Sequence, residues 1–135
     1  MEQGTRHKEQ GTDNGRRRKG DDIAERLLDA VEGVRRLLPA LQVDLASKHV
    51  AKQLWRAATG GGSNYEEARA AESSADFVHK IRLATKELRE ALYWLRVAQR
   101  SDWLRRGVAD GLVDEIDQLV AILIASARTA KSRAP

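Results

Sequence analysis

The chain has 135 residues, no cysteine and a formal net charge of +4. This length supports one domain with a core of its own, and the lack of cysteine excludes a disulfide framework and thiolate chemistry. No apolar run approaches the roughly 18 residues that a membrane span needs, and the N-terminus has no apolar signal-peptide core. We therefore expect a cytoplasmic protein.

The positive charge is concentrated at the two ends of the sequence. Residues 1–20 carry six basic and three acidic side chains, and residues 128–135 carry three basic and no acidic ones. The residues between them have a net negative charge, so the overall charge does not by itself indicate a nucleic-acid-binding body. We interpret 1–20 as a disordered basic tail, in which the run at 16–19 either contacts phosphates or acts as a solubilising segment.

Two helices are predicted in the first half of the chain. Apolar residues at alternating steps of four and three predict a helix over 22–38, capped by Asp21 or Asp22 and ended by Pro39. A second apolar stripe follows and predicts a further helix, for which Ser47 is a plausible cap.

Gly60, Gly61 and Gly62 interrupt the second helical pattern. Each glycine costs about 1 kcal/mol of helix stability relative to alanine. Three in succession indicate a kink, a break or a very close approach by another helix. Because residues 65–71 are again compatible with a helix, we favour a helix that continues through a kink.

The clearest periodicity lies in the second half. It predicts a third helix from a cap at Ser73 or Ser74 to about Gln99, then a turn at Ser101 and Asp102. Its apolar stripe is Phe77, Ile81, Ala84, Leu88, Ala91, Leu95 and Ala98. A fourth helix is expected over about 107–130, apolar around so much of its circumference that the excess favours a subunit interface.

Four such helices, with short connections and no predicted strand, indicate an all-α fold, an antiparallel up-down four-helix bundle. We divide the chain into the tail at 1–20, the bundle at 21–131 and a second disordered tail at 132–135.

The histidines His7, His49 and His79 give no catalytic or metal-binding pattern. None follows a glutamate by three residues, as the Glu-x-x-His spacing of di-iron bundles requires. None has an arginine four to six residues before it, as helical RNA-cleaving domains need. The glycine run lacks the Gly-Lys-Ser/Thr and the preceding strand of a phosphate-binding loop, and no Ser–His spacing suggests a nucleophile. We expect no metal, no cofactor and no enzymatic activity.

Two polar residues fall on or beside the apolar stripe of the second helix. Asn64 lies on the stripe, and Glu67 lies one turn further on. Because buried polar groups are hydrogen-bonded, we interpret Asn64 and Glu67 as a structural polar pair, either between helices or at a kink. A ligand site is the alternative.

A line of basic residues with one tyrosine is the sharpest feature of the third helix. Its members recur at alternating steps of four and three, which places them within about 40° of one line opposite the apolar stripe. They are Arg82, Lys86, Arg89, Tyr93, Arg96 and Arg100, and the second helix adds Lys48, Lys52 and Arg56. Arginine with an interleaved aromatic residue suits a phosphate backbone and exposed bases, so these nine are the candidate nucleic-acid-binding residues.

The fourth helix offers another explanation for this basic line. Asp110, Asp114 and Asp117 share one line on it, with Glu115 beside them. An acidic and a basic helix can pair within the bundle or across a ring interface, adding register more than stability. Both explanations stay open on the sequence alone.

Five short segments follow one another in an order typical of a known family. They are QLWRAAT at 53–59, NYEEA at 64–68, AESSADFVHK at 71–80, KELRE at 86–90 and YWLR at 93–96. Together they resemble the 23S rRNA intervening-sequence protein family of bacterial four-helix bundles, over roughly 22–131. The family usually has a serine and a branched apolar residue where this chain has Gly60 and Gly61, so a core side chain is lost at position 61.

The resemblance implies a left-handed antiparallel bundle that assembles into a ring, typically a homopentamer. A related branch serves as accessory subunits of reverse transcriptases in diversity-generating retroelements, as basic rings that contact the polymerase and nucleic acid. The partners implied are therefore further copies of the chain, RNA or DNA, and a reverse transcriptase. We expect a non-enzymatic, oligomeric RNA-binding accessory protein, with a protein-interaction scaffold as the alternative.

Overall fold

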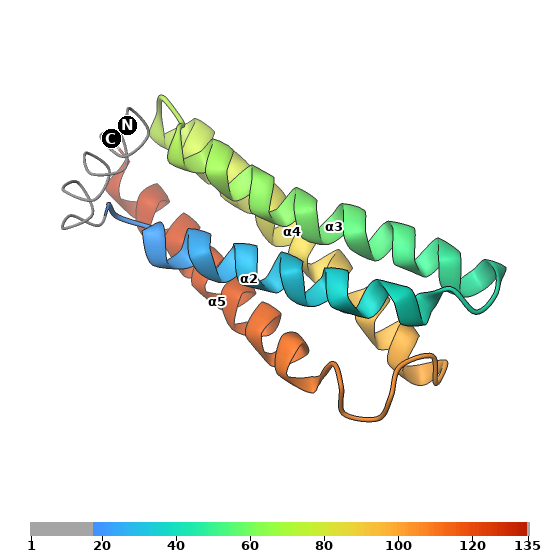
Figure 1. The fold of residues 1–135 in the computed structure, drawn as a ribbon. Helices are drawn as coiled ribbons and strands as arrows, with labels where there is room; N and C mark the ends of the chain where they lie inside the picture. Colours follow the sequence, from blue (N-terminus) through green and yellow to red (C-terminus); the bar gives the residue numbers. More distant parts are fainter. Residues whose placement is uncertain (1–17, 135) are drawn as a thin grey trace, which may run out of the picture.

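Four long helices make up most of the computed structural model, which describes residues 18–134. They are α2 (Asp21–Leu37), α3 (Leu45–Arg69), α4 (Ser74–Arg100) and α5 (Asp110–Arg133), with a short 3-10 helix, η1 (Leu38–Leu41), between the first two. Successive helices run in opposite directions, so the start of α2 and the end of α5 lie at the same end of the molecule (Figure 1). The expected all-α antiparallel four-helix bundle is confirmed.

The first helix begins one residue earlier than expected. Its N-cap is Gly20, whose left-handed backbone (φ 87°) is one that glycine adopts without strain. Asp21 therefore lies in the first turn, where its carboxylate accepts a hydrogen bond from the backbone N–H of Arg18 at 2.7 Å. The prediction that Asp21 or Asp22 caps the helix is wrong, whereas the end near Pro39 is confirmed, because that proline lies inside η1.

The start of α3 also differs from the prediction. Asp44 is the N-cap, and its side chain accepts a hydrogen bond from the backbone N–H of Ser47 at 2.8 Å. The Ser47 hydroxyl in turn accepts from the backbone N–H of Asp44 at 2.9 Å, which completes a capping box. Ser47 thus stabilises the helix start from its third position and is not the cap.

The glycine run does not break α3, which is one helix from Leu45 to Arg69. A Cβ built on Gly61 would lie 2.5 Å from Cδ2 of Leu88, whereas one on Gly62 would meet nothing closer than 4.0 Å. Leu88 is almost fully buried and occupies the space that a side chain at position 61 would fill. Of the three explanations for this run, close approach by another helix is the one that the contacts support, and the neighbour is α4.

The last two helices follow the predicted pattern with shifted ends. Ser73 caps α4 as expected, accepting a hydrogen bond from the backbone N–H of Asp76 at 3.1 Å. Asp102 (φ 59°) and Gly107 (φ 81°) bend the loop that follows. α5 begins at Asp110, three residues later than expected, and continues to Arg133.

The predicted tails are only partly covered by the described residues. Residues 1–17 and Pro135 lie outside them. The backbone carbonyl of Gly20 accepts a hydrogen bond from the Tyr65 hydroxyl at 3.2 Å, so the chain just before α2 is attached to α3. At the other end, residues 132 and 133 are helical, so the predicted boundary at 131 is two residues too early.

The core is one apolar cluster to which all four helices contribute. On α5, Leu119 and Leu123 are fully buried, and Leu112, Val113 and Ile124 pack partly buried against the same cluster. Most of the apolar side chains of α5 therefore pack against the core of the same bundle. The apolar width of α5 does not by itself indicate a subunit interface, which stays a prediction.

Candidate nucleic-acid interface

The basic line on α4 lies on the surface of the bundle, as the sequence predicted. All six of its members are exposed, and Tyr93 keeps 59% of its surface accessible. Among residues 18–134, none of the five basic side chains is held by an ion pair or a side-chain hydrogen bond. These cations are therefore available to an external anion.

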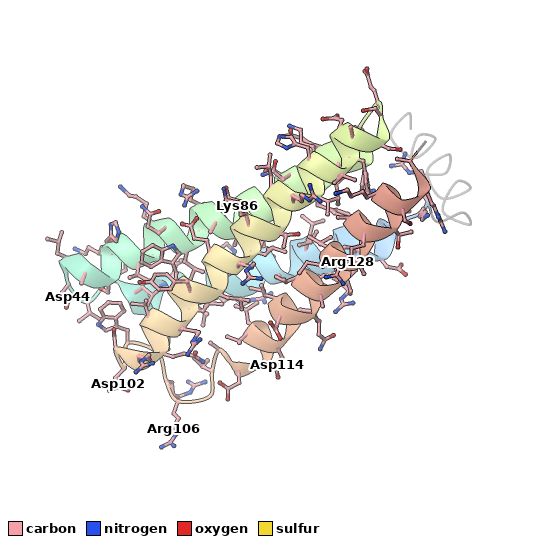
Figure 2. The ribbon with its side chains drawn as sticks, turned by 180° about the vertical axis from the view of Figure 1, so that it is seen from behind. Asp44, Lys86, Asp102, Arg106, Asp114 and Arg128 are labelled. Atoms are coloured by element: carbon pink, nitrogen blue, oxygen red, sulfur yellow. The ribbon has the colours of Figure 1, made fainter. Side chains whose placement is uncertain are left out.

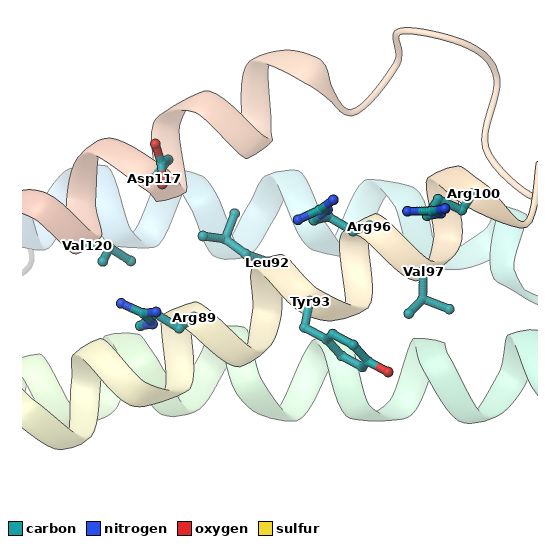
Figure 3. Close-up of a pocket in the computed structure, with 8 residues that line it drawn as sticks. All are labelled: Arg89, Leu92, Tyr93, Arg96, Val97, Arg100, Asp117 and Val120. Atoms are coloured by element: carbon teal, nitrogen blue, oxygen red, sulfur yellow. The ribbon is translucent and has the colours of Figure 1, made fainter.

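A groove runs between α4 and α5 along this line. It consists of three hollows of about 520, 240 and 320 Å³, and each shares at least one lining residue with the next. Arg89, Arg96 and Arg100 line the largest hollow, which Figure 3 shows together with Leu92 and Val120. We call this feature the basic groove and define it by Arg82, Lys86, Arg89, Arg96, Arg100, Arg128 and Lys131.

Two of these cations come from α5 and were not among the predicted site residues. Arg128 and Lys131 line the middle hollow together with three cations of α4, and no acidic residue lines it. Figure 2 shows this side of the molecule, with Lys86 on α4 and Arg128 on α5 labelled. The sequence signal was present, since the two residues are three positions apart near the end of the bundle, but their charge was counted with the C-terminal end of the sequence.

The acidic residues of α5 do not neutralise the basic groove within the described chain. Glu115 faces α2, where it accepts hydrogen bonds from Nε and Nη2 of Arg26 at 2.7 and 3.0 Å. The hydrogen bond from Arg26 lowers the pKa of Glu115 below its ordinary value. Asp117 lines the largest hollow but forms no ion pair among residues 18–134, and Asp110 accepts only a weak hydrogen bond from Gln99 at 3.3 Å. Charge pairing inside one bundle therefore does not explain the basic line.

The three predicted site residues on α3 are separated from the groove. Arg56 is held by two carboxylates of α4, with Nη1 at 3.4 Å from Glu87 and Nη2 at 2.5 Å from Glu90. Lys48 and Lys52 are exposed but do not line any of the three hollows. Helical spacing identified exposed cations on each helix, but it gave no information on which neighbour each helix face meets.

A short row of aromatic rings connects the basic line to α3. The rings of Tyr93 and Trp94 lie edge to face with centroids 4.9 Å apart, and Trp94 meets His49 of α3 in the same way at 5.7 Å. The indole N–H of Trp94 donates to Glu90 at 3.0 Å. Trp94 is fixed by these contacts, so it gives the exposed Tyr93 ring a firm support.

The predicted polar pair on α3 has two separate structural roles. Asn64 donates through Nδ2 to the backbone carbonyl of Gly60 at 2.9 Å, one turn back in the same helix. Glu67 accepts from Nζ of Lys80 on α4 at 2.7 Å, and this hydrogen bond raises the pKa of Lys80. Asn64 and Glu67 do not hydrogen-bond to each other, so the prediction that they form a pair is wrong. Each side chain instead makes a structural contact of its own.

Residues 18–134 offer neither a cluster of metal ligands nor a helix that could span a membrane. Within residues 18–134, no three His, Asp or Glu side chains converge as metal ligands would. Over the same range, none of the helices combines the length and the apolar character that crossing a bilayer demands.

Fold and surface together define a helical bundle protein with a cationic groove between its last two helices. The family model of the 23S rRNA-intervening sequence protein matches residues 22–125, more than half of the chain. The chain therefore belongs to this family, as the sequence motifs indicated.

A solved structure supports the same assignment. It is the 1.70 Å crystal structure of a protein with unknown function from the S23 ribosomal protein family of Bacteroides thetaiotaomicron VPI-5482. The two chains are 27% identical and superpose with a TM-score of 0.72, over 78% of this chain and 97% of the other. No curated protein matches the chain significantly.

Proposed function

We propose that this protein is a non-enzymatic RNA-binding accessory protein that contacts RNA through the basic groove. The observation that supports this most strongly is that seven cations line one groove and none of them is paired among the described residues. Unpaired cations at close spacing repel one another, and an external polyanion relieves that repulsion. Release of the counterions that the polyanion carries adds to the affinity.

Repetition of the groove would strengthen a weak contact. The resemblance implies a homopentameric ring, and several grooves on one ring would bind a long RNA with higher avidity than one groove alone. The cytoplasm is the compartment in which we expect this assembly.

The test is the salt dependence of RNA binding by the 135-residue chain and by a variant in which Arg82, Lys86, Arg89 and Arg96 are replaced by glutamine. We expect at least tenfold weaker binding at low salt. The slope of log K against log [salt] should become shallower by roughly 0.7 for each phosphate that the variant no longer neutralises. Both proteins keep the basic N-terminal segment, so the difference reports on the groove alone.

A matched pair of double variants separates position from charge. Lys86→Gln with Arg89→Gln removes two charges from the groove, and Arg35→Gln with Arg36→Gln removes two exposed charges from α2. Only the groove variant should lose affinity. Equal losses in both would show that binding follows net charge and would contradict the proposal.

A protein-interaction scaffold is the second candidate, and the exposed acidic residues Asp110, Asp114 and Asp117 favour it. These carboxylates could pair with the cations of another copy of the chain. The resemblance also implies a second kind of partner, a reverse transcriptase. Light scattering coupled to gel filtration, with and without nuclease treatment in high salt, distinguishes the two. A ring that loses bound nucleic acid on stripping supports the RNA proposal. A ring that carries none, and that captures a protein partner in a nuclease-treated pulldown, supports the scaffold.

A further inference from the structure

We infer that the basic groove selects single-stranded over double-stranded RNA, with a base stacked on Tyr93 and the backbone phosphates along the cations. This inference rests on the proposed function and names the class of nucleic acid that the groove takes. It follows from the apolar floor of the groove, from the uneven distribution of its charges, and from the support beneath the Tyr93 ring.

The floor of the groove is apolar. The largest hollow is lined between its arginines by the half-buried Leu92 and Val97 and the buried Val120. The middle hollow is lined by the half-buried Ile124 and the buried Ala127. In duplex RNA the bases are stacked inside the helix, and proteins contact its phosphates and 2′-hydroxyl groups from outside. A duplex would leave this apolar surface uncovered, whereas unpaired bases can lie on it.

Charge is distributed unevenly along the groove. The middle hollow is lined by Arg82, Lys86 and Arg89 of α4 and by Arg128 and Lys131 of α5, without an acidic residue. The largest hollow has only three cations, all of them arginines, and also contains Asp117, so it carries less net positive charge. The middle hollow is therefore suited to phosphates, and the largest hollow, at the Arg100 end of the groove, to bases with fewer phosphates nearby.

Tyr93 lies at the rim of the base-binding end. Its ring is 59% exposed, and its edge-to-face contact with Trp94 holds it in place. In Figure 3 the Tyr93 ring lies on the opposite side of α4 from Asp117 and Val120, so the face of the ring is not covered by α5. An aromatic ring that is exposed, supported and flanked by arginines is the usual platform for an unpaired base.

The distance along the groove suits a short strand. Arg82 and Arg100 are 18 residues apart on one continuous helix, which is about 27 Å at 1.5 Å per residue. Single-strand-binding surfaces that combine a charged groove with aromatic platforms engage roughly 4–16 nucleotides. A mixed-sequence 12-mer without self-complementarity is therefore an adequate probe.

The experiment compares fluorescence anisotropy of this labelled 12-mer, alone and annealed to its complement, with the 135-residue chain and two Tyr93 variants. We expect the single strand to bind at least tenfold more tightly than the duplex at equal salt. Tyr93→Leu should weaken single-strand binding about tenfold with an unchanged salt slope and leave duplex binding unaffected. Tyr93→Phe, which retains the ring, should retain the affinity.

The outcomes separate this inference from the proposed function. Equal affinity for the two probes, or equal behaviour of the Tyr93→Leu and Tyr93→Phe variants, would overturn the inference and leave the RNA proposal standing. Binding of neither probe would overturn both. Circular dichroism of each variant identifies a loss of fold, because Tyr93 is exposed and its replacement should leave the helical signal unchanged.

Discussion

The two flanks of α4 both carry charged side chains, but only the flank that meets α3 has them paired. On that flank Glu87 and Glu90 hold Arg56, and Lys80 holds Glu67. On the flank that meets α5, the cations from Arg82 to Arg100 have no partner among the described residues. The packing differs as well, since Gly61 lets α3 and α4 approach closely, whereas surface hollows lie along the junction of α4 and α5. The paired charges on the α3 flank position the helices, and the unpaired cations on the α5 flank are available for binding.

The largest expected effect comes from adding volume to the closely packed flank. Gly61→Leu should destabilise the protein by about 3 kcal/mol, because even its Cβ would overlap with Leu88. Urea unfolding measures this change. Gly62→Ala, one position on, would bring its Cβ only to an ordinary contact with Val31 at 4.0 Å and should instead stabilise α3 by up to about 1 kcal/mol. Similar effects of the two substitutions would contradict the close approach.

Removing a paired charge from the same flank should have a smaller effect. Glu90 accepts hydrogen bonds from Arg56 and from the indole of Trp94. Glu90→Gln should cost roughly 0.5–1 kcal/mol, because the pair is partly exposed and the amide retains only part of the bonding. A double-mutant cycle with Arg56→Gln measures the coupling, and a value near zero would show that this ion pair does not hold the two helices.

The ion pair between α2 and α5 predicts a pH dependence. Arg26 lowers the pKa of Glu115, so the pair's contribution is fully present above the unfolded pKa of about 4.5 and is lost as the pH falls through the lower folded value. Glu115→Gln should lower the free energy of unfolding by roughly 0.5 kcal/mol at about pH 6 and by less at about pH 3. The same loss at both pH values would show that the carboxylate's charge is not what matters.

The smallest expected effect on stability belongs to the basic groove. Replacing Arg82, Lys86, Arg89 and Arg96 with glutamine should change the free energy of unfolding by less than about 0.5 kcal/mol, because these cations have no partners among the described residues. A larger decrease, measured by urea unfolding without RNA, would indicate that the cations hold the fold together and would weaken the distinction between the two flanks.

Much of this arrangement follows from the sequence, because helical periodicity depends only on local geometry. The four helices and the exposed line from Arg82 to Arg100 were predicted from spacing, and Ser73 is one of the two serines predicted as the cap of α4. The ends were less accurate where two residues competed for one role, as when Asp44 rather than Ser47 capped α3. Only Ser47 was predicted as a cap, because a serine suits either position of a capping box and the pattern alone does not show which one it takes.

The remaining features depend on which helix faces which, and one helix's periodicity carries no such information. Arg56 was grouped with the basic line because of its charge, yet Glu87 and Glu90 lie opposite it. Arg128 and Lys131 were missed because their role depends on lying across from Lys86. From the sequence alone Gly61 only weakens α3, and its role becomes clear because Leu88 of α4 packs directly against it.

Photo-crosslinking tests the central claim most directly, because it identifies where RNA lies on the protein. A single-stranded 12-mer carrying 4-thiouridine would be irradiated with the 135-residue chain, and the cross-linked peptides mapped by mass spectrometry. We predict cross-links within 82–100 and 117–131, concentrated near Tyr93, and none on α2. Cross-links distributed over α2 and α3, or absent from α4, would contradict RNA binding in the basic groove.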